Sequence, residues 1–445
     1  MTVSRSGLSL EQAPPISVPF RFFVTAPIFG LLAALLLLIY GPEALTNRWV
    51  PATLALTHLI TLGFLGMIMC GAMMQMLPVL AGSPVPKVKP VATAVHILLT
   101  IGILALASGF LSGTTGLFHL ALTALGLGFL IFIIAISIAL IRIRTPNDTI
   151  HGMRLAIASL ATTVILGLTI GAGFSGMTSL NQLIPLTDIH LGWGILGWIG
   201  LLVVGVAYQV VPMFQLTPEY PGKVTAPLNW VIFATLIIWA PLYLAWGNGH
   251  LSKLVPDIWM ILPATGYLLF AGVTLWLQQK RRRRVSDVTL LFWRVGMIFV
   301  AACLLLWLAG FIPAIKNQPA FSLLLGIWLL FGVAASVVNG MLYKIVPFLA
   351  WFHLQNRQVA LMSMGKVKVP NMKELMPDRL TRRQLFAHLA TLLLLTLALI
   401  WPNPLAHIAG LSLGLSCTLL LLNLLQAARR YRQVNQELSD FEASR

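Results

Sequence analysis

Apolar residues follow one another along this chain in long, nearly uninterrupted runs, and short polar segments between the runs hold most of the charged residues. About twelve runs approach the roughly 20 residues that a helix needs to cross the hydrocarbon core of a bilayer. We therefore predict an all-α, polytopic membrane protein. The predicted spans are 22–41, 51–77, 90–111, 116–142, 151–175, 188–214, 226–247, 256–279, 288–313, 320–349, 384–402 and 404–428.

The second predicted span is the first of three similar segments, each rich in glycine and each ending at a proline. The three prolines recur at nearly equal intervals, and the register that superposes them also superposes one glycine of each segment. The matched residues are Pro78, Pro212 and Pro347, and Gly71, Gly205 and Gly340. Self-similarity at a fixed period indicates internal repetition. We therefore predict three four-helix repeats, 20–145, 150–284 and 288–432, in a pseudo-threefold ring with the second helix of each repeat innermost.

Composition and charge agree with this prediction. The chain is 58% hydrophobic and 9% charged, with mean hydropathy +0.90, a balance that excludes a soluble globular protein. If the N-terminus is cytoplasmic, 26 of the 29 lysines and arginines lie on the cytoplasmic side, and only Arg48, Lys253 and Lys316 lie outside. This is the positive-inside pattern. The net charge of +17 then reflects membrane topology and not nucleic-acid binding.

The same topology predicts the organisation of the chain. We expect a cytoplasmic N-terminal tail (1–19), one membrane domain (20–432) with a cytoplasmic loop (352–383), and a cytoplasmic C-terminal tail (433–445). The N-terminal residues lack the apolar core of a cleavable signal, so the first helix is expected to direct insertion. The basic run 280–284 is expected to be a stop signal at a helix end. The loop is expected to lie on the membrane or to dock a soluble partner.

The chemistry available inside the membrane is limited. None of the twelve Asp and Glu residues lies in the middle of a predicted span, which counts against a carboxylate-driven carrier. Histidines remain as candidate ligands, because a neutral imidazole is a good axial ligand for haem iron and also binds copper. His58 and His190 lie just inside the predicted outer ends of two second helices. We expect them to bind a cofactor, with Asp188 orienting His190.

Further candidates follow from position alone. His119 and His407 occupy matching places at the predicted outer ends of two fourth helices. Met69 and Met73 share one helical face beside Cys70, and thioether and thiol ligands suit Cu(I), although such a stripe also serves as adaptable packing. Copper is therefore an alternative cofactor. The chain contains no CxxCH motif, so a covalent c-type haem is excluded.

Twelve predicted helices in three fours, with a histidine near the outer end of the second helix, resemble catalytic subunit I of the haem-copper oxidases. The segment from His58 to Pro78 is similar to the second helix of the nitric-oxide-reductase branch, where a haem-ligand histidine precedes a glycine-containing apolar run and a Val/Leu-Pro exit. The resemblance implies that His58 is a haem ligand. It also implies that His190 falls where the family's sixth helix carries a copper ligand.

The chain departs from that family in its seventh and tenth helices. The family carries a histidine pair in the seventh and an HxH motif in the tenth, whereas 226–247 and 320–349 contain no histidine. The binuclear oxygen-reducing site is therefore not matched. The chain is more similar to the NnrS family of haem- and copper-containing membrane proteins tied to nitric oxide metabolism, whose opening motif it shares at Pro19–Phe23.

These observations together predict a bacterial inner-membrane protein that binds b-type haem non-covalently near the outer face. Its expected role is electron transfer or the handling of O2 or NO, with cytochrome c, quinol or subunits of a respiratory complex as partners and the lipid bilayer as solvent. A copper or haem transporter and a cofactor-free partner subunit are the alternatives. An active terminal oxidase is the least expected, because several ligands would have to be replaced at once.

Overall fold

The computed structural model describes residues 14–282, 286–363 and 365–444. This part of the chain is all-α and contains no strand. Its helices are α1 (Ser17–Tyr40), η2 (Gly41–Leu45), α2 (Pro51–His58), η3 (Leu59–Gly66), α3 (Met67–Ala81), α4 (Val88–Ser112), α5 (Thr115–Ile141), α6 (Asp148–Phe174), α7 (Leu183–Gly192), η4 (Trp193–Gly200), α8 (Leu201–Gln215), α9 (Gly222–Gly247), α10 (Leu254–Trp259), α11 (Ile261–Gln279), α12 (Val288–Ala309), α13 (Pro313–Lys316), α14 (Ala320–Ile327), η5 (Trp328–Ala335), α15 (Ser336–Ala360), α16 (Met372–Leu375), α17 (Asp378–Ala398) and α18 (Pro402–Ala443).

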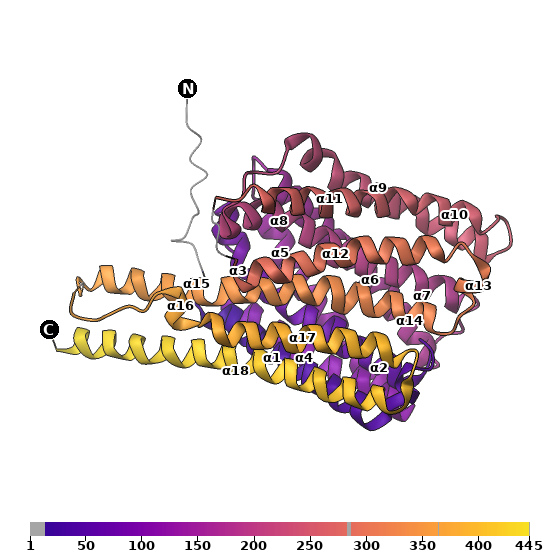
Figure 1. The fold of residues 1–445 in the computed structure, drawn as a ribbon, viewed down its shortest axis with the longest axis horizontal. Helices are drawn as coiled ribbons and strands as arrows, with labels where there is room; N and C mark the ends of the chain where they lie inside the picture. The colour runs from indigo at the N-terminus through magenta and orange to yellow at the C-terminus, as the bar shows by residue number, and fades with distance from the viewer. Residues whose placement is uncertain (1–13, 283–285, 364, 445) are drawn as a thin grey trace.

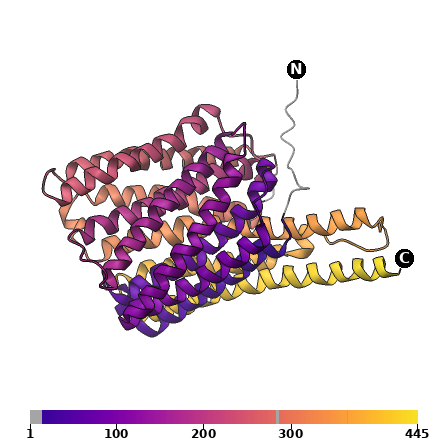
Figure 2. The same cartoon turned by 180° about the vertical axis from the view of Figure 1, so that it is seen from behind.

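Within the described residues, eleven continuous helices are long and apolar enough to cross a membrane. They lie side by side in one bundle, with α13 at one end and α16 at the other (Figures 1 and 2). Large apolar side chains stay exposed on the outside of the bundle, among them Ile39, Leu305 and Leu393, which are 65%, 68% and 59% exposed. Water disfavours such a surface, whereas lipid does not. The predicted polytopic membrane protein is thus confirmed at this level.

The predicted span 384–402 coincides largely with α17, which is not among these eleven helices of the described chain. The helix begins at Asp378 and carries Arg379, Arg382 and Arg383 in its first turns, so its polar start lowers its mean hydropathy. The basic run predicted at 280–284 lies partly outside the described residues, because 283–285 are not described.

Three of the long helices change from α- to π-helical geometry and back. The π-helical segments are η3, η4 and η5, and their first residues are Leu59, Trp193 and Trp328. Each of these residues lies the same number of positions before the matched proline of its own segment, so the π-helical segments share the register of the prolines. A π-helical turn is wider than an α-helical turn and is frequent at functional sites. His58 immediately precedes η3, and His190 comes shortly before η4.

The matched glycines bring these helices against the preceding long helix. A methyl group on any of them would collide with a neighbouring helix, so the close approach depends on the missing side chain. A Cβ would lie 2.8 Å from Phe22 Cβ at Gly71, 2.9 Å from Gly152 Cα at Gly205, and 2.8 Å from Phe292 Cβ at Gly340. These three glycines therefore allow the helices to pack closely.

Two helices extend beyond the bundle at the α16 end (Figure 1). Helix α15 continues to Ala360, and α18 continues to Ala443. Leu354, Val434 and Leu438 join the two helices in a small apolar cluster. The segment predicted as a loop at 352–383 therefore begins as a helix, and the predicted tail 433–445 is helical to Ala443, because each helix covers an apolar face of the other.

Candidate functional site

A cavity of about 930 Å³ extends from the α13 end of the bundle into its interior. Its volume is near the upper end of the range of about 300–1,000 Å³ that is typical of small-molecule and cofactor pockets. Helices α2, α6 and α7 and all three π-helical segments contribute to its lining, which is mostly apolar. Aromatic side chains form part of the wall, including Phe110, Phe174, Trp198, Trp239 and Tyr267.

His58 lines this cavity from the end of α2. Its Nδ1 lies 2.8 Å from the Leu54 carbonyl oxygen, and its ring is tilted against Phe110 with the centroids 5.3 Å apart. A carbonyl oxygen can only accept a hydrogen bond, so Nδ1 is the protonated nitrogen of the neutral ring. The lone pair of His58 is therefore on Nε2.

His190 lines the same cavity from α7. Its Nδ1 lies 3.0 Å from the Thr163 carbonyl oxygen on α6. Within the described residues, neither His190 Nε2 nor His58 Nε2 has a hydrogen-bond partner. The structure thus brings together the two histidines that the sequence ranked first.

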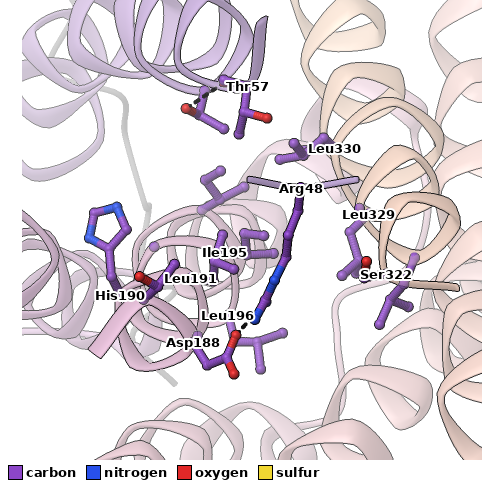
Figure 3. Close-up of a pocket in the computed structure, with 18 of the residues that line it drawn as sticks. Arg48, Thr57, Asp188, His190, Leu191, Ile195, Leu196, Ser322, Leu329 and Leu330 are labelled. Atoms are coloured by element: carbon purple, nitrogen blue, oxygen red, sulfur yellow. Dashed lines mark hydrogen bonds and ion pairs between the residues drawn. The ribbon is translucent and has the colours of Figure 1, made fainter. Parts of the chain in front are cut away.

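The predicted role of Asp188 was wrong. Its carboxylate does not bind His190 but accepts from Arg48 Nη1 at 2.5 Å and from the Tyr243 hydroxyl at 2.7 Å. Figure 3 shows Arg48 extended across the cavity to Asp188, with His190 to one side of this pair. Residues two positions apart on a helix point in different directions. Asp188 therefore reaches the cavity wall on another side of α7 from His190.

Charged residues gather where the cavity opens at the α13 end. Lys253 donates to both carboxylate oxygens of Asp257, at 2.6 and 2.8 Å, and Lys316 Nζ lies 3.8 Å from Asp257 Oδ2. Arg48, Lys253 and Lys316, the three basic residues that the sequence assigned to the outer side, all line this one cavity. No function was predicted for these three residues, although basic residues are rare on the predicted outer side and could have indicated a functional site there.

His119 and His407 are not part of this arrangement. His119 is exposed on α5, and neither histidine lines the cavity. The His407 Nδ1 lies 2.8 Å from the Leu38 carbonyl oxygen, and the ring fills the space above Gly41, where an added Cβ would collide with it. His407 therefore packs the contact between α18 and the end of α1.

The copper candidates lie in the buried part of α3. Met69, Cys70 and Met73 are 4%, 0% and 1% exposed and belong to the main apolar core. In the portion of the chain that the structure describes, no group of three His, Cys, Asp or Glu side chains is placed to hold a metal ion. The surroundings of the three residues are those of packing side chains.

No protein-family model matches the chain, and no curated protein is significantly similar to it. The residues of the cavity and their geometry therefore provide the evidence for its function.

Proposed function

We propose that this protein is a membrane haem-binding protein in which His58 and His190 would hold one b-type haem. The observation that most supports this proposal is that the two imidazole rings have the same hydrogen-bonding pattern at one cavity. Both line one cavity, both bind a backbone carbonyl through Nδ1, and both leave Nε2 without a partner among the described residues. Histidines that ligate a metal commonly donate their other N–H to a carbonyl or carboxylate, which fixes the ring and its tautomer.

The cavity also fits the remainder of such a group. A porphyrin is a large, flat and mostly apolar molecule, and a histidine nitrogen is one of the common protein ligands of its iron. The cavity has about 930 Å³ and mostly apolar walls. The donor set and the shape of the cavity are therefore both compatible with haem.

A haem in this cavity would supply one-electron redox chemistry. The chain would hold it with two neutral imidazoles, orient the rings through Leu54 and Thr163, and exclude water with aromatic side chains. If both histidines held the iron, no ligand position would remain for O2 or NO. The donor set therefore favours electron transfer over gas handling.

We further infer that the bundle has the three-repeat architecture of an oxidase subunit I-like protein. The π-helical segments begin in the same register as the matched prolines, and the matched glycine of each repeat contacts that repeat's first long helix. This proposal and the positive-inside pattern together imply that the His58 end of the bundle would lie at the outer face of a bacterial inner membrane. The resemblance to the haem-copper oxidase superfamily and to the NnrS family supports the same proposal.

The test is an absorption spectrum of the detergent-purified protein, oxidised and then reduced with dithionite, together with a pyridine haemochrome assay. We expect one b-type haem per chain with a low-spin spectrum. His58→Ala and His190→Ala should each lose the haem or convert it to a high-spin form, because one axial nitrogen is gone. His119→Ala, which removes an exposed histidine, is the matched control and should keep the wild-type spectrum.

Two results would overturn the proposal. One is a colourless wild-type protein after expression with an ample haem supply. The other is a haem spectrum that both cavity variants leave unchanged while they elute as folded monodisperse protein from gel filtration.

A further inference from the structure

Six side chains form a connected group at the mouth of the cavity, and we call this group the mouth cluster. It consists of Arg48, Asp188, Tyr243, Lys253, Asp257 and Lys316. Tyr243 links its two halves: its hydroxyl donates to Asp188, and Lys253 Nζ lies 5.6 Å from the centre of its ring. The cluster therefore behaves as one electrostatic unit.

Its charges do not balance. Arg48 has Asp188 as its own partner at 2.5 Å. Asp257 has both oxygens within hydrogen-bonding distance of Lys253, and Lys316 reaches only one of them, at 3.8 Å. Three basic and two acidic side chains leave one positive charge in excess. Lys316 is the cation without a carboxylate of its own.

The surroundings of Lys316 also indicate that its charge is not fully neutralised. Partial burial, and then the neighbouring ammonium of Lys253, lower the pKa of Lys316, and Asp257 compensates only in part. The side chain is still 44% exposed, so a ligand can reach it from solvent. A second anion at this position would favour the charged ammonium and raise its pKa again.

We infer that the mouth cluster binds a carboxylate group of an amphipathic ligand, with Lys316 and Lys253 holding the carboxylate and the apolar cavity holding the body of the ligand. A carboxylate carries one negative charge, which matches the single excess positive charge, whereas a phosphate monoester carries about two. The mostly apolar walls below the cluster suit an apolar body.

The proposed carboxylate site rests on the proposed function in one respect: if the ligand is haem, the bound carboxylate is one of its propionate groups. A free organic acid that enters the same cavity is the other source of the same chemistry. The two sources are separated by comparing haem with its dimethyl ester, which lacks the charges, and by adding propionate ion to haem-free protein.

The first measurement is the dissociation constant of haem and of haem dimethyl ester for the wild type and for Lys316→Gln. We expect Lys316→Gln to weaken haem binding about tenfold, the lower end of the range for a charged hydrogen bond because the site is partly exposed. Binding of the ester should not change. Lys316→Arg keeps the charge and should retain most of the affinity. Lys373→Gln is the control: Lys373 also pairs with an aspartate, Asp378, but lies at the α16 end of the bundle.

The second measurement is the pKa of Lys316 from the ¹³C NMR signal of the reductively methylated protein, assigned with Lys316→Arg. Ligand binding should raise this pKa. If the carboxylate belongs to the haem, addition of haem raises the pKa. If the ligand is a free organic acid, addition of propionate ion to haem-free protein raises it. Equal affinity for haem and ester together with a Lys316 pKa that neither addition moves would overturn the inference. If neither haem nor ester binds, the proposed function fails, and the propionate titration still decides the carboxylate site.

Discussion

The contact between Gly167 and His190 offers a sharp test of the histidine pair. Gly167 lies on α6, one turn beyond Thr163, whose carbonyl holds His190 Nδ1. A Cβ at Gly167 would lie 3.0 Å from His190 Cε1 and 3.5 Å from Nδ1. Ordinary contacts begin at 3.4 Å, so in Gly167→Ala the imidazole has to move by a few tenths of an ångström. The backbone of α6 cannot move away easily, because it packs against η4 and α8.

The size of the effect follows from that displacement. A shift of a few tenths of an ångström is comparable to the roughly 0.5 Å within which a binding constellation has to be held. Overpacking by one methyl group typically costs about 1–3 kcal/mol. If this cost appears in ligand binding, the dissociation constant of haem rises by about 5- to 150-fold. The low-spin signal in electron paramagnetic resonance should shift as well, because one axial nitrogen changes its orientation.

The assay is transfer of haem from the membrane protein to an excess of a haem-free acceptor protein, followed by absorption. Gly272→Ala serves as the control, because a Cβ at Gly272 on α11 meets nothing within 4 Å. Both variants add one methyl group to a helix, but only one displaces His190. A Gly167→Ala protein with the affinity and ligand-field signals of the wild type would refute the assignment of His190 as a ligand.

Two predictions concern stability, measured as thermal unfolding in detergent. Gly205→Ala should destabilise the protein by about 1–3 kcal/mol, because the new Cβ would lie 2.9 Å from Gly152 Cα. The control Gly272→Ala should not destabilise it, because its Cβ meets nothing within 4 Å. Equal melting temperatures of the two variants would contradict this reasoning. Lys344→Met should lower the free energy of unfolding by about 1–3 kcal/mol, less than the loss expected for a fully buried ion pair. The reason is that Lys344 and Asp287 form an ion pair at 2.7 Å whose side chains are only 16% and 12% exposed. Adding Asp287→Asn should recover part of that loss, and a fully additive double variant would show that the ion pair has no role.

The sequence was sufficient for the parts of the fold that depend on local pattern. Long apolar runs predicted the spanning helices, because a helix in lipid has to satisfy its backbone hydrogen bonds internally. The position of His58 and His190 near equivalent ends of two similar helices was enough to place both at one cavity. Their Nδ1 partners could not be predicted in full: Leu54 is one turn away on the same helix, but Thr163 comes from another helix.

The rest depended on contacts between distant segments. Arg48 and Asp188 are 140 residues apart, and the sequence offers no local sign of their pairing. The assignment of Asp188 to His190 overlooked that positions i and i+2 of a helix diverge, so this error was avoidable. The helical extension of α15 was missed because much of its apolar face is covered by α18, which follows much later in the chain.

A third histidine, His388, differs from His58 and His190 in its hydrogen bonds. His388 on α17 lies beside η5, but its Nε2 is 2.8 Å from Ser336 Oγ and its Nδ1 is 3.4 Å from Asn339 Nδ2. Its ring stacks on Phe331 with the centroids 4.4 Å apart, and the side chain is fully buried. Both ring nitrogens and one ring face are thus occupied by the protein itself. His58 and His190 each satisfy one nitrogen, have no partner for Nε2 among the described residues, and line the large cavity. These features together, and not the presence of a histidine, distinguish the two proposed ligands from His388.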